Sequence, residues 1–275
     1  MALHAGAAGV TLLQPHWWPW TLSALLADHL LLAGSGLWPR SNLLGPNWTH
    51  LPPVADTAGS AGAPAAVAIT IDDGPEPEVT GRVLDVLDEH HATATFFCIG
   101  ERVERHRALA RAIVGRGHEI ANHSYRHLMS FSLLGPRGMA REIARAQQVI
   151  GETTGEIARF FRAPAGLRNP FLEPVLTRAN LQLVSWTRRG FDTVYGSAGR
   201  VLGSLTRDLR DGDILLLHDG HAASTPSGAP VILEVLPQLL RALTEAQLTP
   251  ITLRAAFERA AAIPAPVSAV PGARS

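Results

Sequence analysis

The amino-acid sequence predicts a parallel α/β fold with an N-terminal hydrophobic helical extension. Short runs of apolar, β-prone residues alternate regularly with helical patterns over about 195 residues, which is typical of a parallel sheet covered by helices. We count about seven such units, without a sequence repeat of fixed period. The length of 275 residues allows one large domain of about 200 to 250 residues plus an appendage, or two small domains.

The apolar runs predict the strands, and the amphipathic patterns between them predict the helices. The expected strands are 67–71, 93–99, 118–121, 159–162, 182–186, 213–217 and 250–253. The expected helices are 79–90, 103–115, 139–150, 169–180, 198–209 and 231–246, with a last helical turn after residue 253. In a closed parallel barrel, catalytic side chains lie at the C-terminal ends of the strands and in the loops that follow.

The first 50 residues differ from the rest. Residues 17–38 contain many Leu and Ala and no Arg, and tryptophans lie at both ends. This length suits one membrane crossing of about 20 residues, but Asp28 and His29 near its middle are costly in hydrocarbon. Two interpretations remain open: a membrane anchor, and a helical hairpin packed on the main domain.

Composition shifts predict the domain boundaries. Residues 50–66 are rich in Pro, Gly, Ala and Ser, as linkers are. We therefore expect a hydrophobic helical extension or membrane anchor at 1–49, a linker at 50–66, the α/β domain at 67–262 and an Ala/Pro-rich tail at 263–275.

Charge and residue usage exclude several classes of protein. The 24 basic and 24 acidic residues give zero formal charge, so nothing in the composition favours nucleic-acid binding. The single cysteine, Cys98, excludes an intramolecular disulfide and a Cys-rich zinc site. The chain has no lysine, which excludes Schiff-base chemistry and a P-loop lysine. Any metal must be held by His and carboxylates.

Candidate ligands follow the first and third strands. Asp72 and Asp73 end the first strand and point in different directions, so one can bind a cation while the other faces a substrate water. His123 and His127 are four residues apart, which on a helical turn places both imidazoles on one face, within zinc-ligand spacing. Two His and Asp73 would leave room for water and substrate, as a catalytic zinc site requires.

Further polar residues follow the later strands. Arg162 leaves the fourth strand and can pair with a buried carboxylate, and the turn Pro164-Ala165-Gly166 can aim a main-chain N–H into a pocket. Asp192 follows the fifth strand by a short loop. His218 lies at the mouth of the apolar sixth strand, where it could act as a general acid.

These residues resemble, in order, the five motifs of the polysaccharide deacetylases, the NodB homology domain or carbohydrate esterase family 4. The resemblance covers about residues 65–260. It is carried by the segments Thr70-Ile71-Asp72-Asp73-Gly74-Pro75, His123-Ser124-Tyr125-Arg126-His127, Arg162-Ala163-Pro164-Ala165-Gly166, Asp192 and Leu215-Leu216-Leu217-His218.

The resemblance implies a fold and a metal. The fold is a distorted (β/α) barrel of seven or so units. The metal is a divalent ion, usually zinc, held by the residues that match Asp73, His123 and His127.

It also implies catalytic roles. Asp72 matches the general base, oriented by Arg162. His218 matches the general acid, tuned by Asp192, and the main-chain N–H of Ala165 would complete the oxyanion hole.

Three positions depart from the family pattern. Ile71 replaces a common Phe in the first motif, Ala165 replaces an aromatic residue in the third, and Thr193 replaces a Trp that often follows Asp192. The last two changes remove aromatic surface that can stack on sugar rings. Trp186 or Phe191 could supply a replacement wall.

The leading hypothesis is a metal-dependent hydrolase that removes acetyl groups from N-acetylated sugars of a polysaccharide or glycan in the cell envelope. The first alternative keeps the metal site but acts on another small amide or an O-acetyl ester. Two His and one carboxylate also describe oxygenase iron sites, although Asp72 and His218 have no role there. A non-catalytic carbohydrate-binding domain would lack a ligand or the base, and none is missing.

An anchor at 17–38 would hold the domain at the inner membrane, and a cytoplasmic location is the alternative.

Overall fold

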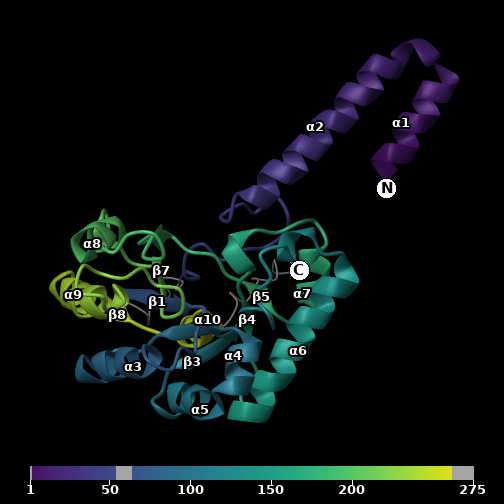
Figure 1. Cartoon of the computed structure of the whole chain (residues 1–275). Coiled ribbons are helices and arrows are strands. Elements are labelled where there is room, and N and C mark those ends of the chain that lie inside the picture. Colours follow the sequence, from purple (N-terminus) through teal and green to yellow (C-terminus); the bar gives the residue numbers. More distant parts are fainter. Residues whose placement is uncertain (1, 54–63, 262–275) are drawn as a thin grey trace, which may run out of the picture.

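The computed structural model describes residues 2–53 and 64–261, and within them a parallel sheet curls into a half-barrel with helices around it (Figure 1). Most of the predicted linker at 50–66 and the whole predicted tail at 263–275 lie outside the described residues. The predicted α/β architecture is confirmed.

The sheet has the strand order β5-β4-β3-β2-β1-β7-β6, and β8 also pairs with β1. Every named pairing is parallel. The strands are β1 (Ala66–Asp72), β2 (Thr95–Cys98), β3 (Glu119–Asn122), β4 (Phe160–Phe161), β5 (Gln182–Leu183), β6 (Arg188–Arg189), β7 (Ile214–His218) and β8 (Thr249–Pro250).

Helices follow most strands, as parallel connections require. They are α1 (Ala2–Leu13), α2 (Trp18–Leu37), α3 (Thr80–Glu89), α4 (Gly100–Arg105), α5 (Arg107–Gly115), α6 (Pro136–Thr154), α7 (Leu172–Arg178), α8 (Ala198–Thr206), α9 (Ile232–Glu245) and α10 (Leu253–Ala261). Three 3-10 turns complete the elements: η1 (Pro15–Trp17), η2 (Phe131–Leu133) and η3 (Pro164–Gly166).

The core lies on both faces of the central strands. All seven residues of β1 and all five of β7 are buried. Strands covered on both faces read as continuous apolar runs, which is why these two were recognisable in the sequence. Their ionisable residues come at the C-terminal ends, where Asp72 and His218 are register partners.

Two predicted elements are divided in the structure. The helix expected at 103–115 is part of two helices, because His106 leaves the helical conformation between α4 and α5. The strand expected at 182–186 ends at Leu183, and the chain forms the additional strand β6 beside β7. Beyond Leu183 the chain pairs with the N-terminal segment, where Trp48 bridges to Val184 and its carbonyl accepts a hydrogen bond from the Ser185 N–H.

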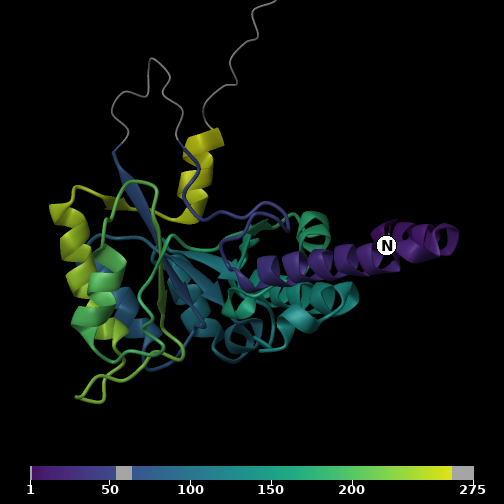
Figure 2. The ribbon, with the colours of Figure 1, turned by 90° about the horizontal axis from the view of Figure 1, so that it is seen from above.

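The N-terminal helices form a hairpin. Helix α2 runs out from the barrel, and α1 returns beside it (Figures 1 and 2). The hairpin is not packed on the domain as one interpretation expected, because only Ser35 and Gly36 of α2 are buried. Within residues 2–53 and 64–261, no helix combines the length and apolarity needed to cross a membrane. The following segment does join the barrel, where Trp48 packs against Phe160 and Phe257.

Candidate metal centre and active site

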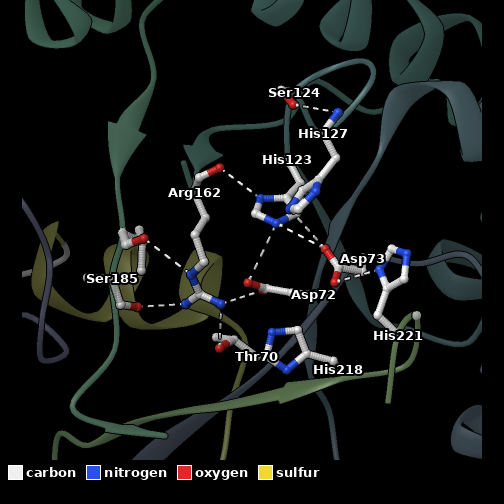
Figure 3. A network of polar contacts seen from close by, with 12 residues as sticks. Thr70, Asp72, Asp73, His123, Ser124, His127, Arg162, Ser185, His218 and His221 are labelled. Carbon is white, nitrogen blue, oxygen red and sulfur yellow. Dashed lines mark hydrogen bonds and ion pairs between the residues drawn. The ribbon is translucent and has the colours of Figure 1, made fainter. Parts of the chain in front are cut away.

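The candidate site is a cavity of about 550 Å³ at the C-terminal ends of the strands. Asp72 from β1, His218 from β7, and the loops that follow β1 and β3 line it. Because carboxyl ends of parallel strands meet at one edge of the sheet, residues distant in sequence converge there. Figure 3 shows this convergence.

The two adjacent aspartates separate as the sequence predicts. Asp72 is the last residue of β1, and one of its carboxylate oxygens accepts a hydrogen bond from Arg162 at 2.5 Å. Asp73 turns the other way with a left-handed φ of 75°. Its carboxylate faces the imidazoles of His123 and His127 (Figure 3).

Asp73, His123 and His127 form a group that can hold a metal ion. Each offers one ligand atom, and these atoms lie within 4.8 Å of one another. The Oδ1 of Asp73 lies 3.3 Å from the Nε2 of each histidine, and this buried oxygen has no hydrogen-bond partner among the described residues. A buried carboxylate oxygen without a donor, facing two imidazoles, fits a divalent cation.

His123 is oriented by the main chain. Its Nδ1 lies 2.8 Å from the carbonyl oxygen of Arg162, so Nδ1 is the protonated nitrogen and donates to that oxygen. Its Nε2 therefore presents a lone pair toward Asp73. Support of this kind, from a carbonyl behind the imidazole, is usual for histidines that bind metals.

The His-x-x-x-His spacing does not lie on a helical turn. Both histidines are in the loop after β3, where Ser124 and His127 have left-handed φ values of 62° and 51°. The predicted helical geometry was wrong, although the predicted proximity is present, with ring centroids 4.8 Å apart. The Ser124 hydroxyl accepts a hydrogen bond from the His127 N–H and closes the loop.

The electrostatics suit cation binding. Burial opposes ionisation of Asp73, but the adjacent His123 and His221 outweigh it and lower the pKa of its carboxyl well below the ordinary value. Burial and the neighbouring His123 lower the pKa of His127 to about 4. At neutral pH the site therefore offers a carboxylate and a neutral imidazole, the forms that coordinate metals.

Arg162 is buried and fully engaged. Its guanidinium donates to Asp72, to the hydroxyl of Thr70 at 2.9 Å and to the carbonyl of Ser185 at 2.6 Å. It also lies over the ring of Phe97, 4.1 Å from the centroid. These contacts fix the rotamer of Asp72 and keep one of its oxygens occupied.

His218 is paired with Asp192, as the sequence predicts. The Nδ1 of His218 lies 2.9 Å from one carboxylate oxygen, and its main-chain N–H donates to the other at 2.7 Å. Burial disfavours the imidazolium, but the hydrogen bond and charge of Asp192 outweigh it and raise the pKa of His218 above the ordinary value. His218 therefore remains protonated to higher pH than an exposed histidine.

Comparisons with known proteins identify the family of this chain. The polysaccharide deacetylase family profile matches residues 60–184. A chitooligosaccharide deacetylase of Sinorhizobium fredii is 37% identical over 160 residues, which are 58% of this chain and 74% of that protein. A peptidoglycan-N-acetylglucosamine deacetylase of Bacillus cereus is 33% identical over 175 residues, covering 63% and 81%. This chain belongs to the polysaccharide deacetylase family.

A solved relative shares the fold. The family 4 carbohydrate esterase from Streptomyces lividans, in complex with acetate, has a TM-score of 0.62 at 31% identity. The match covers 68% of this chain and 93% of that one. The chain is accordingly a deacetylase, an enzyme that hydrolyses the N-acetyl amide of sugars.

The deacetylase cavity has one aromatic wall. Trp186 is buried and lines the cavity beside Ala165, which has a left-handed φ of 55° in the turn η3. Thr193 also lines it. Phe191, the other aromatic residue considered as a wall, is 45% exposed and is not among the lining residues.

Two residues of the loop after β7 contact the site without having been assigned a role from the sequence. His221 lies with its Nδ1 3.1 Å from the Oδ2 of Asp73 (Figure 3). Asp219 is buried, accepts a hydrogen bond from Thr80 at 2.5 Å and packs against Gly74. A loop position three residues beyond the expected acid was the only sequence signal for His221.

Proposed function

We propose that this deacetylase removes acetyl groups from N-acetylglucosamine units of an envelope glycan, using a zinc ion held by Asp73, His123 and His127. The observation that carries the proposal is the convergence of this ligand group with Asp72 and His218 on one cavity. A carboxylate and two imidazoles leave coordination positions open, as catalytic zinc sites do. When bound, the ion acts as a Lewis acid toward the acetamide carbonyl and makes water more acidic.

Asp72 is the general base in this proposal. Its Oδ1 is held by Arg162, and its Oδ2 lies 3.8 Å from the Nε2 of His123, on the side of the metal ligands. This second oxygen is the one placed to accept a proton from the attacking water. Arg162 acts as a positioning residue, since it fixes the carboxylate without reaching the substrate.

His218 is the general acid. Its Nδ1 is occupied by Asp192, so Nε2 carries the proton that the departing amine needs. The main-chain N–H of Ala165 donates to the oxygen that becomes negative during attack. Trp186 supplies the apolar wall against which a sugar ring lies.

The substrate class follows from the relatives. Those described above act on chitooligosaccharide or on peptidoglycan N-acetylglucosamine, as their names state. Both substrates carry N-acetylated sugar units. We therefore propose that the enzyme acts at the cell envelope.

The test of the function is acetate release. Chito-oligosaccharide and peptidoglycan fragments are incubated with the metal-loaded protein, and with protein treated with a chelator and then given zinc. We expect chelation to abolish release and zinc to restore it, because the ligands supply no Lewis acid by themselves. Faster cleavage of an O-acetyl ester than of either amide would replace the proposed function with esterase activity.

We further propose that the hairpin formed by residues 2–37 associates with a membrane surface. Leu22, Leu26 and Leu30 form a stripe at four-residue spacing, and they are 56%, 59% and 64% exposed. Exposed tryptophans lie at both ends of α2. Apolar residues flanked by tryptophans suit the boundary between headgroups and acyl chains.

Substitutions in the full-length chain test this membrane contact. We expect replacement of Leu22, Leu26 and Leu30 by Gln to reduce co-flotation with phospholipid vesicles severalfold, because the buried apolar area is lost. Leu133→Gln, at an 84% exposed leucine on the barrel, is the matched control. Equal flotation of the triple variant and the control would refute the proposal.

A further inference from the structure

The deacetylase cavity is lined by more positive charge than the assigned chemistry uses. Four arginines line it, none of which has a role in the mechanism proposed above. They are Arg102, Arg105, Arg126 and Arg189. The acetyl group of a neutral glycan gives such charges nothing to bind.

Three of these arginines are already neutralised. Each forms an ion pair with a glutamate at 2.6 to 2.7 Å. The pairs are Arg102 with Glu76, Arg105 with Glu101 and Arg126 with Glu142.

Arg189 differs from these three. Among the described residues it forms no ion pair, and its buried Nε has no hydrogen-bond partner. Its guanidinium lies 5.5 Å from the ring centroid of Trp186 and 5.1 Å from that of Phe191. Contact with the two aromatic rings restrains the guanidinium and leaves its N–H groups to find acceptors elsewhere.

The neighbouring Arg188, in the same strand, differs from Arg189 because its guanidinium is hydrogen-bonded within the protein. Successive residues of a strand point to opposite faces. Arg188 donates to Asp213 at 2.5 Å and to the carbonyls of Arg207 and Asp208. The strand therefore satisfies one arginine completely and presents the other, unsatisfied, to the cavity.

The register of β6 places Arg189 close to the reaction. Arg189 pairs with Leu216, and Leu216 and His218 both line the cavity. The backbone of Arg189 is thus displaced by two residues, or about 7 Å, along the neighbouring strand from the proposed acid. A group bound by this guanidinium would belong to the reacting sugar or to the adjacent one.

We propose that Arg189 binds an anionic group of the glycan, a carboxylate or a phosphate, next to the N-acetyl group that is hydrolysed. This inference rests on the proposed deacetylase function and specifies its substrate. Planar guanidinium groups bind carboxylate and phosphate through two parallel N–H donors, and stacking pre-organises them for it. The aromatic surface missing at Ala165 and Thr193 is consistent with recognition that depends less on ring stacking and more on charge.

Three substrates distinguish the source of the anion. They are the neutral N-acetylglucosamine tetramer, an oligomer alternating N-acetylglucosamine with N-acetylmuramic acid, which carries lactyl carboxylates, and an N-acetylglucosamine tetramer carrying a 1-phosphate. We expect the wild-type enzyme to favour one anionic substrate over the neutral tetramer in kcat/KM. Arg189→Gln should lower that preference by a factor on the order of 10 to 100, mainly through KM, since charge-assisted hydrogen bonds are lost.

Two further variants serve as a conservative replacement of Arg189 and as a control at another cavity arginine. Arg189→Lys should restore part of the preference, because a point charge attracts the anion without the two-pronged geometry. Arg105→Gln removes a cavity arginine that Glu101 already neutralises, and it should leave the preference as in the wild type. If Arg189 only supports the stacked aromatic rings, Arg189→Gln will slow all three substrates equally, which overturns the inference.

A binding measurement separates this inference from the deacetylase function. Calorimetry on the Asp72→Asn background measures affinity for the anionic oligomer while turnover is strongly slowed. Adding Arg189→Gln should weaken that binding by 10-fold or more and change the affinity for the neutral tetramer less. An absence of acetate release from every substrate by the metal-loaded enzyme would refute the deacetylase function, whereas unchanged affinity in the double variant would refute the anion site.

Discussion

The His123→Ala variant is expected to bind no stoichiometric divalent ion and to lose deacetylase activity to the background level. His123 is one of the three proposed ligand residues, and its Nε2 is directed at Asp73 because its Nδ1 donates to the carbonyl of Arg162. Removing one of three protein ligands from a site that keeps open positions leaves too few donors for tight binding. Metal content per chain, measured by elemental analysis after dialysis, checks this directly.

Loss of activity alone would not establish ligation, because His123 is buried and also supports the loop after β3. His50→Ala is the matched control, since the residue is exposed and its imidazole is hydrogen-bonded only to the hydroxyl of Thr49 among the described residues. Circular dichroism and the unfolding temperature show whether the variant retains its fold. A folded His123→Ala protein with one ion per chain would contradict the proposed ligand set.

Asp72→Asn should keep its metal and lose turnover by a factor of about 10² to 10⁴, as expected when a general base is removed. The amide has the shape of the carboxylate but cannot accept the proton. Its oxygen can still accept the hydrogen bond from Arg162, so the site should remain assembled. The measurement is kcat with the best substrate, together with metal content.

The adjacent residue supplies the contrast for this prediction. Asp73→Asn should lose metal as well as turnover, because the Asp73 carboxylate is the one negatively charged group among the three proposed ligands. Asp72→Asn, in contrast, leaves the buried Arg162 without a charged partner, which lowers the stability of the fold because an unpaired buried charge is unfavourable. The unfolding temperature of Asp72→Asn is therefore measured alongside its kinetics. Wild-type turnover in Asp72→Asn, or loss of its metal, would remove Asp72 from the role of base.

The sequence predicted the strands correctly where a strand could be recognised from its own residues alone. The buried strands β1 and β7 read as apolar runs, and each ends in an ionisable residue, as expected for a site at the C-terminal edge of a parallel sheet. That rule was enough to bring Asp72 and His218 to one edge. The motif resemblance then supplied partners such as Arg162 and Asp192, whose side chains do contact them.

Contacts between distant segments determined the positions of the site residues that lie in loops and of the short strand β6. The two histidines reach Asp73 from a loop with left-handed residues, and His221 joins them from the loop after β7. Strand β6 pairs with β7 in a register that sets Arg189 beside Leu216, and Arg189 lines the cavity. Local periodicity specifies which residues are buried, but pairing between distant segments determines where an interrupted strand resumes and which of its side chains remain unpaired.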